Sequence, residues 1–165
     1  MPLTFRPAET GDIPLLRDLA SEIWRASYAG LLAPGQIEYM LGWMYAAQKI
    51  AQELADGVLW EVAILDAVPA GYLALSSQPD GVAELHKLYL LPELQGQGHG
   101  QAMLAQACAL ATERGAHSLR LRVNKGNTRA LRAYERAGFR IIESIVADIG
   151  GGFVMDDYVL AREGV

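Results

Sequence analysis

A glycine-rich segment between a strand-like run and a helix-like run most constrains the fold of this chain. Residues 95–100 read Gln-Gly-Gln-Gly-His-Gly and separate the apolar run 84–91 from the helical run 101–114. Glycines at alternate positions leave backbone N–H groups uncovered at the positive end of a helix, and such groups bind phosphate or pyrophosphate. The alternative is a glycine-rich turn that binds nothing, because isolated glycine motifs often mislead.

The glycine spacing excludes the two commonest phosphate loops. A dinucleotide fingerprint needs G-x-G-x-x-G, but its third glycine position falls on Gln101 or on Met103, depending on the starting glycine. A Walker loop needs Gly-Lys followed by Ser or Thr, and the chain contains no Gly-Lys pair. The loop therefore requires another kind of phosphate ligand.

Composition narrows the class of protein. The 165 residues fit one domain, 1–165, and the net charge of −5 argues against a nucleic-acid partner, whereas it is compatible with a cationic substrate. The single cysteine, Cys108, cannot form an internal disulfide and fits a reducing compartment. The sequence has neither an apolar stretch that could span a bilayer nor the layout of a signal peptide. We therefore expect a cytoplasmic protein with no membrane partner.

Hydrophobic periodicity predicts an alternation of strands and helices. Seven strand segments are expected, at residues 3–6, 59–65, 71–77, 83–91, 117–123, 139–147 and 153–161. Five helical segments are expected, at residues 12–28, 36–45, 48–56, 101–114 and 128–137, the last with Asn127 as its N-cap. We expect a break at Pro34-Gly35 and a hairpin turn over residues 66–70. The order implies an α/β domain whose mixed sheet has helices on both faces.

Two motifs resemble signatures of the GNAT superfamily of N-acetyltransferases. After a strand, the first has the form Arg/Gln-x-x-Gly-x-Gly/Ala and is matched by Gln95, Gly98 and Gly100. The second has the form Asn-x-x-Ala-x-x-x-Tyr-x-x-x-Gly-Phe and is matched by Asn127, Ala130, Tyr134, Gly138 and Phe139. Residues 37–45 also resemble a branch of small bacterial members that includes polyamine and other small-amine acetyltransferases. The resemblance implies a mostly antiparallel sheet of seven strands, with a splay between the two strands that flank the acyl-CoA site.

The resemblance also implies acetyl-CoA as the co-substrate. The N–H groups of residues 95–101 would bind its pyrophosphate, the backbone of Leu88 and Leu90 would pair with its pantetheine arm, and an N–H in this stretch would hold the oxyanion. Asn127 would be both cap and ligand contact, with a cap alone as the alternative. The expected cofactor-binding residues are Leu88, Tyr89, Leu90, Gln95, Gly96, Gln97, Gly98, His99, Gly100, Gln101, Asn127, Ala130 and Tyr134. Lys125, Arg129 and Arg132 would reach the 3′-phosphate or remain solvated.

The same resemblance assigns acid and base roles. Tyr134 lies two helical turns after Asn127 and would assist departure of the thiolate. The pKa of a thiol is about 8.5 and that of tyrosine about 10, so a hydrogen bond from the phenol matters more than full proton transfer to the sulfur. Glu84 and His86 alternate on one strand and would remove the proton of the acceptor amine, with Glu84 favoured. The alternatives are structural: Tyr134 would be a core tyrosine, Glu84 a solvated carboxylate at the strand edge, and His86 a core histidine whose hydrogen bonds are satisfied.

Aromatic residues concentrate in the region that covers the acceptor side of this fold. We expect Trp24 and Trp43 to belong to the core, and Tyr28, together with Glu84, to contact the substrate. Asp156 and Asp157 are candidates to attract an ammonium group, although a solvated strand face is the favoured interpretation.

The predicted function is acetyl transfer from acetyl-CoA to a primary amine of a small molecule or peptide by direct attack, without a metal. The three histidines and one cysteine have no spacing typical of a metal site. The alternative is a coenzyme-A-binding sensor without transfer activity. An O-acetyltransferase or hydrolase lacks a recognisable nucleophile, since no Gly-x-Ser-x-Gly occurs. The acceptor stays open, and homodimers are common in the family.

Overall fold

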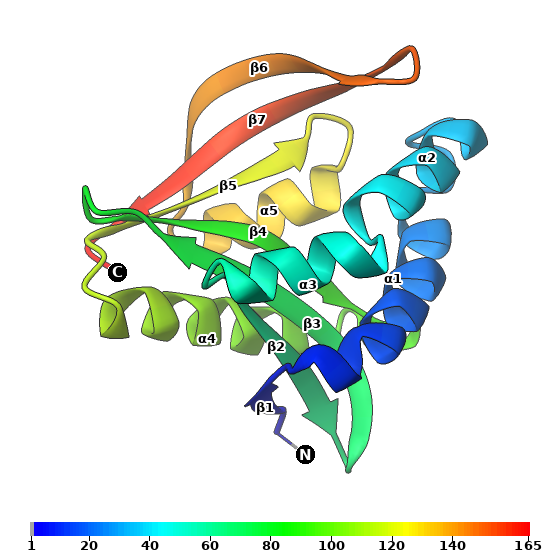
Figure 1. Cartoon of the computed structure of the whole chain (residues 1–165). Coiled ribbons are helices and arrows are strands. Elements are labelled where there is room, and N and C mark those ends of the chain that lie inside the picture. Colours follow the sequence, from blue (N-terminus) through cyan, green and yellow to red (C-terminus); the bar gives the residue numbers. More distant parts are fainter. Residues whose placement is uncertain (1) are drawn as a thin grey trace.

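The computed structural model describes residues 2–165 as one seven-stranded sheet in the order β1-β2-β3-β4-β5-β7-β6 (Figure 1). Only the β4–β5 pair is parallel, which confirms the expected mixed and mostly antiparallel sheet. The strands are β1 (Thr4–Pro7), β2 (Leu59–Leu65), β3 (Val68–Ser77), β4 (Val82–Leu90), β5 (Ser118–Asn124), β6 (Arg140–Gly150) and β7 (Phe153–Glu163).

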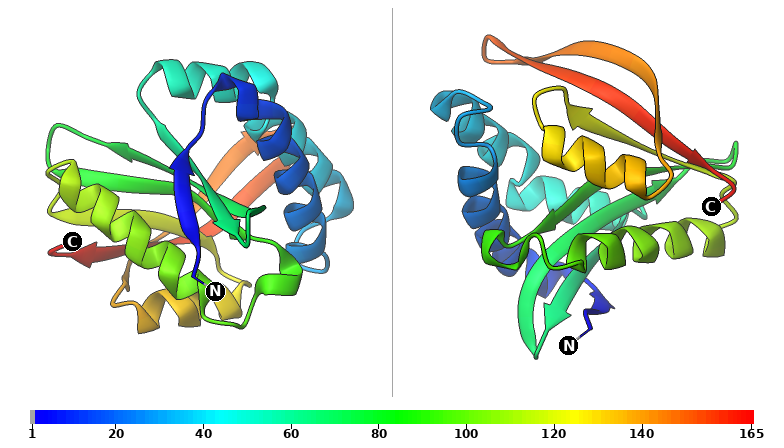
Figure 2. Two further views of the ribbon diagram at one scale, coloured as in Figure 1. Left: turned by 90° about the horizontal axis from the view of Figure 1, so that it is seen from below. Right: turned by 180° about the vertical axis from the view of Figure 1, so that it is seen from behind.

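Five α-helices cover the two faces of the sheet (Figures 1 and 2). One face carries α1 (Ile13–Ser27), α2 (Pro34–Met44) and α3 (Ala47–Ala55), and the other carries α4 (His99–Glu113) and α5 (Thr128–Arg136). Two short 3-10 turns, η1 (Thr10–Asp12) and η2 (Pro92–Leu94), precede α1 and α4. Within residues 2–165, no helix has both the length and the apolar character needed to cross a bilayer.

Two local predictions are wrong for identifiable reasons. Pro34 does not break the chain but is the first residue of α2, because its fixed φ suits the first helical turn and its missing N–H is not needed there. The β2–β3 turn is shorter than expected. It contains only Asp66 and Ala67, both with positive φ (52° and 65°), and this type of turn matches the twist of the two strands.

The strands β4 and β5 separate after a short paired stretch. Residues Val82–Leu85 pair with Ser118–Leu121, whereas β4 continues to Leu90 and β5 to Asn124 without further pairing between them. In Figure 1 the two strands diverge toward the side where α1 lies. We call the unpaired segments, residues 86–90 of β4 and 122–124 of β5, the β4–β5 gap. The expected splay is therefore present.

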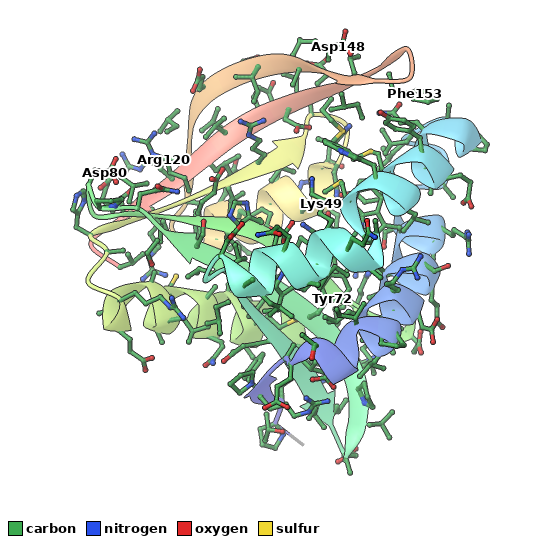
Figure 3. All side chains as sticks on the ribbon, viewed as in Figure 1. Lys49, Tyr72, Asp80, Arg120, Asp148 and Phe153 are labelled. Carbon is green, nitrogen blue, oxygen red and sulfur yellow. The ribbon has the colours of Figure 1, made fainter. Side chains whose placement is uncertain are left out.

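The long β6–β7 hairpin is attached to α2. The Gln36 side chain donates to the Val154 carbonyl oxygen (2.8 Å), and the Tyr39 hydroxyl donates to the Ile149 carbonyl oxygen (2.8 Å). Phe153, at the tip of the hairpin, lies beside the start of α2 (Figure 3). These contacts join α2, which packs on α1, to the hairpin that lies beyond β5 in the sheet.

Replacing Asn127 by Ala should destabilise the protein through α5. The Asn127 Oδ1 accepts the Ala130 N–H (3.2 Å), so the predicted N-cap is confirmed and its loss leaves a helix N–H unpaired. We expect a loss of about 1 kcal/mol in the free energy of unfolding, measured with urea. Asn127→Asp retains the cap and is the control; equal losses in both variants would contradict a capping role.

Candidate active site

The unpaired edge of β4 presents main-chain groups to the β4–β5 gap. The Leu91 N–H donates to the Ala70 carbonyl oxygen (2.9 Å) and so points toward β3. Because successive N–H groups of a strand alternate in direction, the N–H groups of Leu88 and Leu90 point the other way, into the gap. The Gln95 amide donates to the Leu90 carbonyl oxygen (3.2 Å) and ties the following loop to this edge. An extended ligand could therefore pair with β4 as an added strand.

Tyr89 occupies a different position from its two neighbours. By the same alternation its N–H points toward β3, and its side chain lies with the cluster formed by α1, α2 and α3. Its hydroxyl is 3.1 Å from the Tyr28 hydroxyl. Of the three expected contacts on β4, only Leu88 and Leu90 thus offer main-chain donors to the gap.

The loop after β4 has the properties of an anion site. Gly96 and Gly98 have positive φ (78° and 87°), a backbone conformation that other residues rarely adopt. Among the described residues, the N–H groups of residues 96–101 donate to no backbone carbonyl, since the first donor of α4 is that of Ala102. The expectation that the Gln95 N–H is also free is wrong, because it donates to the Pro92 carbonyl (3.2 Å) and closes the turn before the loop. Side chains fix the loop instead: Gln97 donates to the Glu93 carbonyl and Gln101 to the Ala133 carbonyl of α5.

A basic residue of α5 lies next to this loop. A side chain atom built at Gly96 would come within 3.2 Å of the Arg129 Nη2, so the guanidinium is beside the free N–H groups. Lys125, by contrast, pairs with Asp156 at 2.6 Å. Arg129, rather than Lys125, is therefore placed to neutralise an anion bound by the loop.

Tyr134 of α5 packs with the cluster of α4 and α5 and interacts electrostatically with Tyr28 and Tyr89 of the opposite face. Its ring packs edge-on against Phe139, with centroids 5.8 Å apart. Burial raises the pKa of Tyr134 well above the usual value for tyrosine, and the Tyr28 phenol on the opposite face adds to this rise. The phenol therefore stays protonated and can donate a hydrogen bond, whereas full proton transfer to a thiolate is disfavoured.

Glu84 and His86 lie where β4 begins to leave β5. His86 has no partner in the β3–β4 register, because Leu75 opposes Leu85 and Ala74 opposes Lys87. This bulge re-aims the strand, and the His86 Nε2 lies 2.7 Å from the Ser76 Oγ. Loss of solvent around the imidazole lowers the pKa of His86, while the nearby Glu84 carboxylate raises it.

Tyr28 belongs to an aromatic cluster at the end of α1. Trp24 and Tyr28 have ring centroids 4.5 Å apart, and Trp24 is buried, as expected. The expectation that Trp43 is a core residue is wrong. It is 42% exposed and lies under the Lys49 ammonium (4.5 Å), since α2 turns that face to solvent.

Three buried charges were not identified as such from the sequence: Asp157, Lys87 and Glu61, of which Glu61 accepts a hydrogen bond from Gln106 of α4 (2.8 Å). Asp157 is only 2% exposed, so the favoured interpretation of a solvated strand face is wrong; β7 is an inner strand of the sheet at this point. Lys87 is 5% exposed and lies over the Tyr45 and Trp60 rings, and burial lowers its pKa. The alternation of side chains along β4 predicts the burial of Lys87 only if the bulge at His86 is known, because the bulge changes which residues of β4 share a face.

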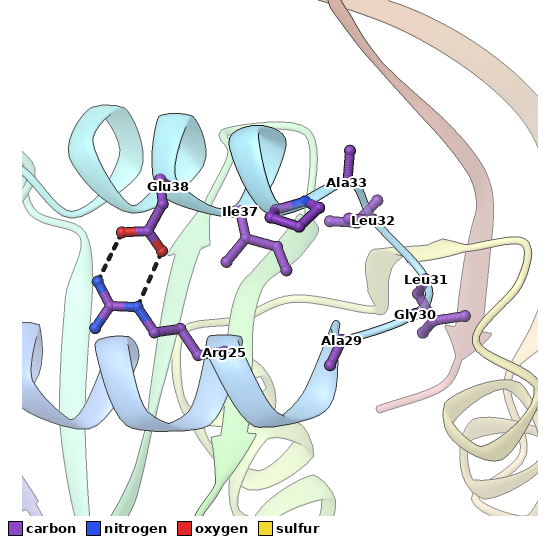
Figure 4. Close-up of a pocket in the computed structure, with 9 residues that line it drawn as sticks. Arg25, Ala29, Gly30, Leu31, Leu32, Ala33, Ile37 and Glu38 are labelled. Carbon is purple, nitrogen blue, oxygen red and sulfur yellow. Dashed lines mark hydrogen bonds and ion pairs between the residues drawn. The ribbon is translucent and has the colours of Figure 1, made fainter.

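A shallow hollow lies on the outer side of the α1–α2 loop, away from these groups (Figure 4). Its lining includes the Arg25–Glu38 ion pair, with contacts of 2.7 and 2.9 Å, which joins α1 to α2. No residue of β4, of the loop 95–101 or of α5 lines it. Nor do any three His, Cys, Asp or Glu side chains within residues 2–165 come close enough to share a metal ion.

The known proteins to which this chain is similar in sequence are acetyltransferases. The sequence model of the acetyltransferase (GNAT) family matches residues 16–139. The spermidine N(1)-acetyltransferase of Thermoplasma acidophilum is 26% identical over 161 residues, which cover 94% of this chain and 97% of that protein. The peptidyl-lysine N-acetyltransferase YjaB of Salmonella typhimurium is 30% identical over 105 residues, 62% of this chain and 65% of that protein.

The fold is shared with solved structures. The PaiA N-acetyltransferase from Thermoplasma acidophilum in complex with coenzyme A has a TM-score of 0.84 and 25% identity, and the match covers 99% of both chains. The match therefore extends over the whole sheet and all five helices.

Glu84→Gln should lower the pKa of His86. The Glu84 carboxylate stabilises the imidazolium form, so removing its charge makes protonation less favourable. The shift can be measured by NMR titration of the His86 ring, with Glu135→Gln on α5 as the control. An unchanged or raised pKa would show that the two side chains are not electrostatically coupled.

Proposed function

The chain belongs to the GNAT family of acetyltransferases and is an acetyl-CoA-dependent N-acetyltransferase. We propose that a primary amine attacks the thioester of acetyl-CoA directly, in the β4–β5 gap. One observation carries this proposal. The free edge of β4 runs directly into a loop whose N–H groups donate to no backbone carbonyl, and Tyr134, on the face of α4 and α5, is near enough to Tyr28 and Tyr89 to interact with their phenols. These three features correspond to the peptide-like arm, the pyrophosphate and the sulfur of one co-substrate.

The residues present fit acetyl-CoA. The carbonyl of Leu88 and the N–H of Leu90 would pair with the pantetheine amides, which leaves the Leu88 N–H free, and the N–H groups of residues 96–101 would bind the pyrophosphate with Arg129 beside them. Because the gap widens beyond the Leu85–Leu121 pair, the arm would lie between the two strands with its thioester near Leu88. The Leu88 N–H would then donate to the oxyanion of the tetrahedral intermediate.

Glu84 and His86 would remove the proton from the acceptor. A primary ammonium has no lone pair, and for a pKa of about 10.4 its deprotonation at neutral pH costs roughly 4–5 kcal/mol. The lowered pKa of His86 keeps its ring neutral and able to accept a proton, and its contact with Ser76 orients it. The amine would then attack the thioester carbonyl, the C–S bond would break, and Tyr134 would donate a hydrogen bond to the departing sulfur.

The named relatives act on amines of different size, spermidine and peptidyl-lysine. A panel of spermidine, putrescine, n-butylamine and a lysine peptide would test transfer, with thiol release from acetyl-CoA as the measurement. Release that depends on one of these amines supports the proposal. Tight binding of acetyl-CoA with no turnover of any amine would instead favour a coenzyme-A-binding sensor.

Tyr134→Phe should lower kcat with little change in the Kd for acetyl-CoA. The variant keeps the ring packing against Phe139 but removes the hydrogen bond to the leaving sulfur, and a bond of this kind contributes about 10- to 100-fold in rate. Steady-state kinetics and calorimetric titration separate the two quantities. A loss of coenzyme affinity with unchanged kcat would refute the assigned role.

Arg129→Ala should weaken coenzyme A binding about 3- to 10-fold, because an exposed charge near a bound phosphate contributes modestly. The loss should shrink as salt is raised from low to physiological concentration, since exposed charges are screened. Arg136→Ala, at the far end of α5, is the control. Equal effects of both substitutions would indicate a general charge effect rather than a contact at the loop.

A further inference from the structure

Asp157 is a buried carboxylate without a partner. Its Oδ1 forms no hydrogen bond with any of residues 2–165, and the residue is 2% exposed. Taking a carboxylate out of water without a compensating partner is unfavourable, and nearly all buried polar groups in folded proteins are paired. The protein thus keeps a destabilising group at this position of β7.

The side chain faces the acceptor side of the sheet. Met155, two residues earlier on β7, packs with the cluster of α1, α2 and α3, whereas Tyr158 packs with the opposite cluster. Asp157 shares the face of Met155 because side chains two apart in a strand point the same way. The Asp157 carboxylate also raises the pKa of Tyr28, so the two groups are near enough to interact across the gap.

The surrounding charges leave the carboxylate uncompensated. Burial raises the pKa of Asp157, and the Asp156 carboxylate adds to this rise, while Arg122 and Lys125 oppose it. Lys125 is paired with Asp156, and neither cation forms an ion pair with Asp157 among the described residues. Tyr28 is likewise engaged, with the Tyr89 hydroxyl at 3.1 Å. The loop between α1 and α2 covers this region, since Leu31 lies against Gly126 of the β5–α5 loop. A negative charge beside aromatic rings in a covered site is suited to a cation.

Asp157 is too far from Glu84 for both to contact one nitrogen. Glu84 aligns with Arg120 on β5, and Asp157 aligns with Asn124, four residues further along. With about 3.3 Å per residue and about 4.8 Å per strand, the two Cα atoms are roughly 16 Å apart. A nitrogen whose proton Glu84 accepts directly is therefore out of reach of Asp157, so one ligand contacts both carboxylates only with two separate groups.

We infer that Asp157 binds a second ammonium group of the acceptor, which makes the preferred acceptor a diamine or polyamine. This inference rests on the proposed function, in which Glu84 and His86 serve the nitrogen that is acetylated. The second nitrogen stays protonated on Asp157 and takes no part in the chemistry. Its ion pair with the carboxylate supplies the partner that Oδ1 lacks.

Asp157→Asn should raise the KM for putrescine about 10- to 100-fold, the effect of losing a charged hydrogen bond in a covered site. The KM for n-butylamine, which has the same carbon chain but one nitrogen, should not change, nor should kcat for either amine. The control is Asp156→Asn, whose carboxylate is 55% exposed and paired with Lys125. Equal losses for both amines, or no loss for putrescine, would overturn the inference.

Two measurements work without turnover. Asp157→Asn should raise the melting temperature of the ligand-free protein, by about 2–4 °C, because it removes an unpaired buried charge. Calorimetric titration of putrescine into the coenzyme A complex should show binding that the variant loses. If no amine is acetylated, the proposed function fails, and the titration still decides whether Asp157 binds a diammonium ligand. A lowered melting temperature together with unchanged putrescine binding would assign the carboxylate a purely structural role.

Discussion

The separation of β4 from β5 is the constraint on which the rest of the site depends. A sheet interior normally pairs every backbone group, and an unpaired edge favours association with another strand. Here the unpaired edge of β4 lies inside the molecule, between helices on both faces, where no second sheet can reach it. Apart from the Leu90 carbonyl, which accepts from Gln95, its main-chain groups are open to a narrow, peptide-like ligand. In the proposed function, the glycine loop that follows β4 binds the anionic end of that ligand.

The same separation brings the two faces of the sheet into contact. In the paired part, the strands insulate the α4–α5 side from the α1–α3 side. Along the gap, Tyr134 on one side and Tyr28 and Tyr89 on the other influence each other's protonation. In the proposed function, the departing sulfur is therefore served from the face of α4 and α5, and the acceptor from the face of α1, α2 and α3.

Two of the three buried charges, Lys87 and Asp157, lie on the face that α1, α2 and α3 cover, whereas Glu61 is bonded to α4 on the other face. Lys87 is held over two aromatic rings, and Asp157 has an oxygen with no partner in residues 2–165. Groups of this kind lower stability and are retained where a ligand uses them. The homodimer implied by the family resemblance and the cytoplasmic location stay predictions, because neither depends on contacts within one chain.

The sequence by itself determined the order of the elements, the loop after β4, the cap at Asn127 and the family, because these depend on local periodicity and on motifs of fixed spacing. Tertiary structure alone decided the bulge at His86, the exposure of Trp43 and the burial of Asp157 and Lys87. Each of these depends on which strand or helix lies alongside, and residues as distant in sequence as Tyr28 and Asp157 leave no local pattern. For the same reason Arg129, rather than Lys125, was placed beside the phosphate loop only by the packing of α5 against the start of α4.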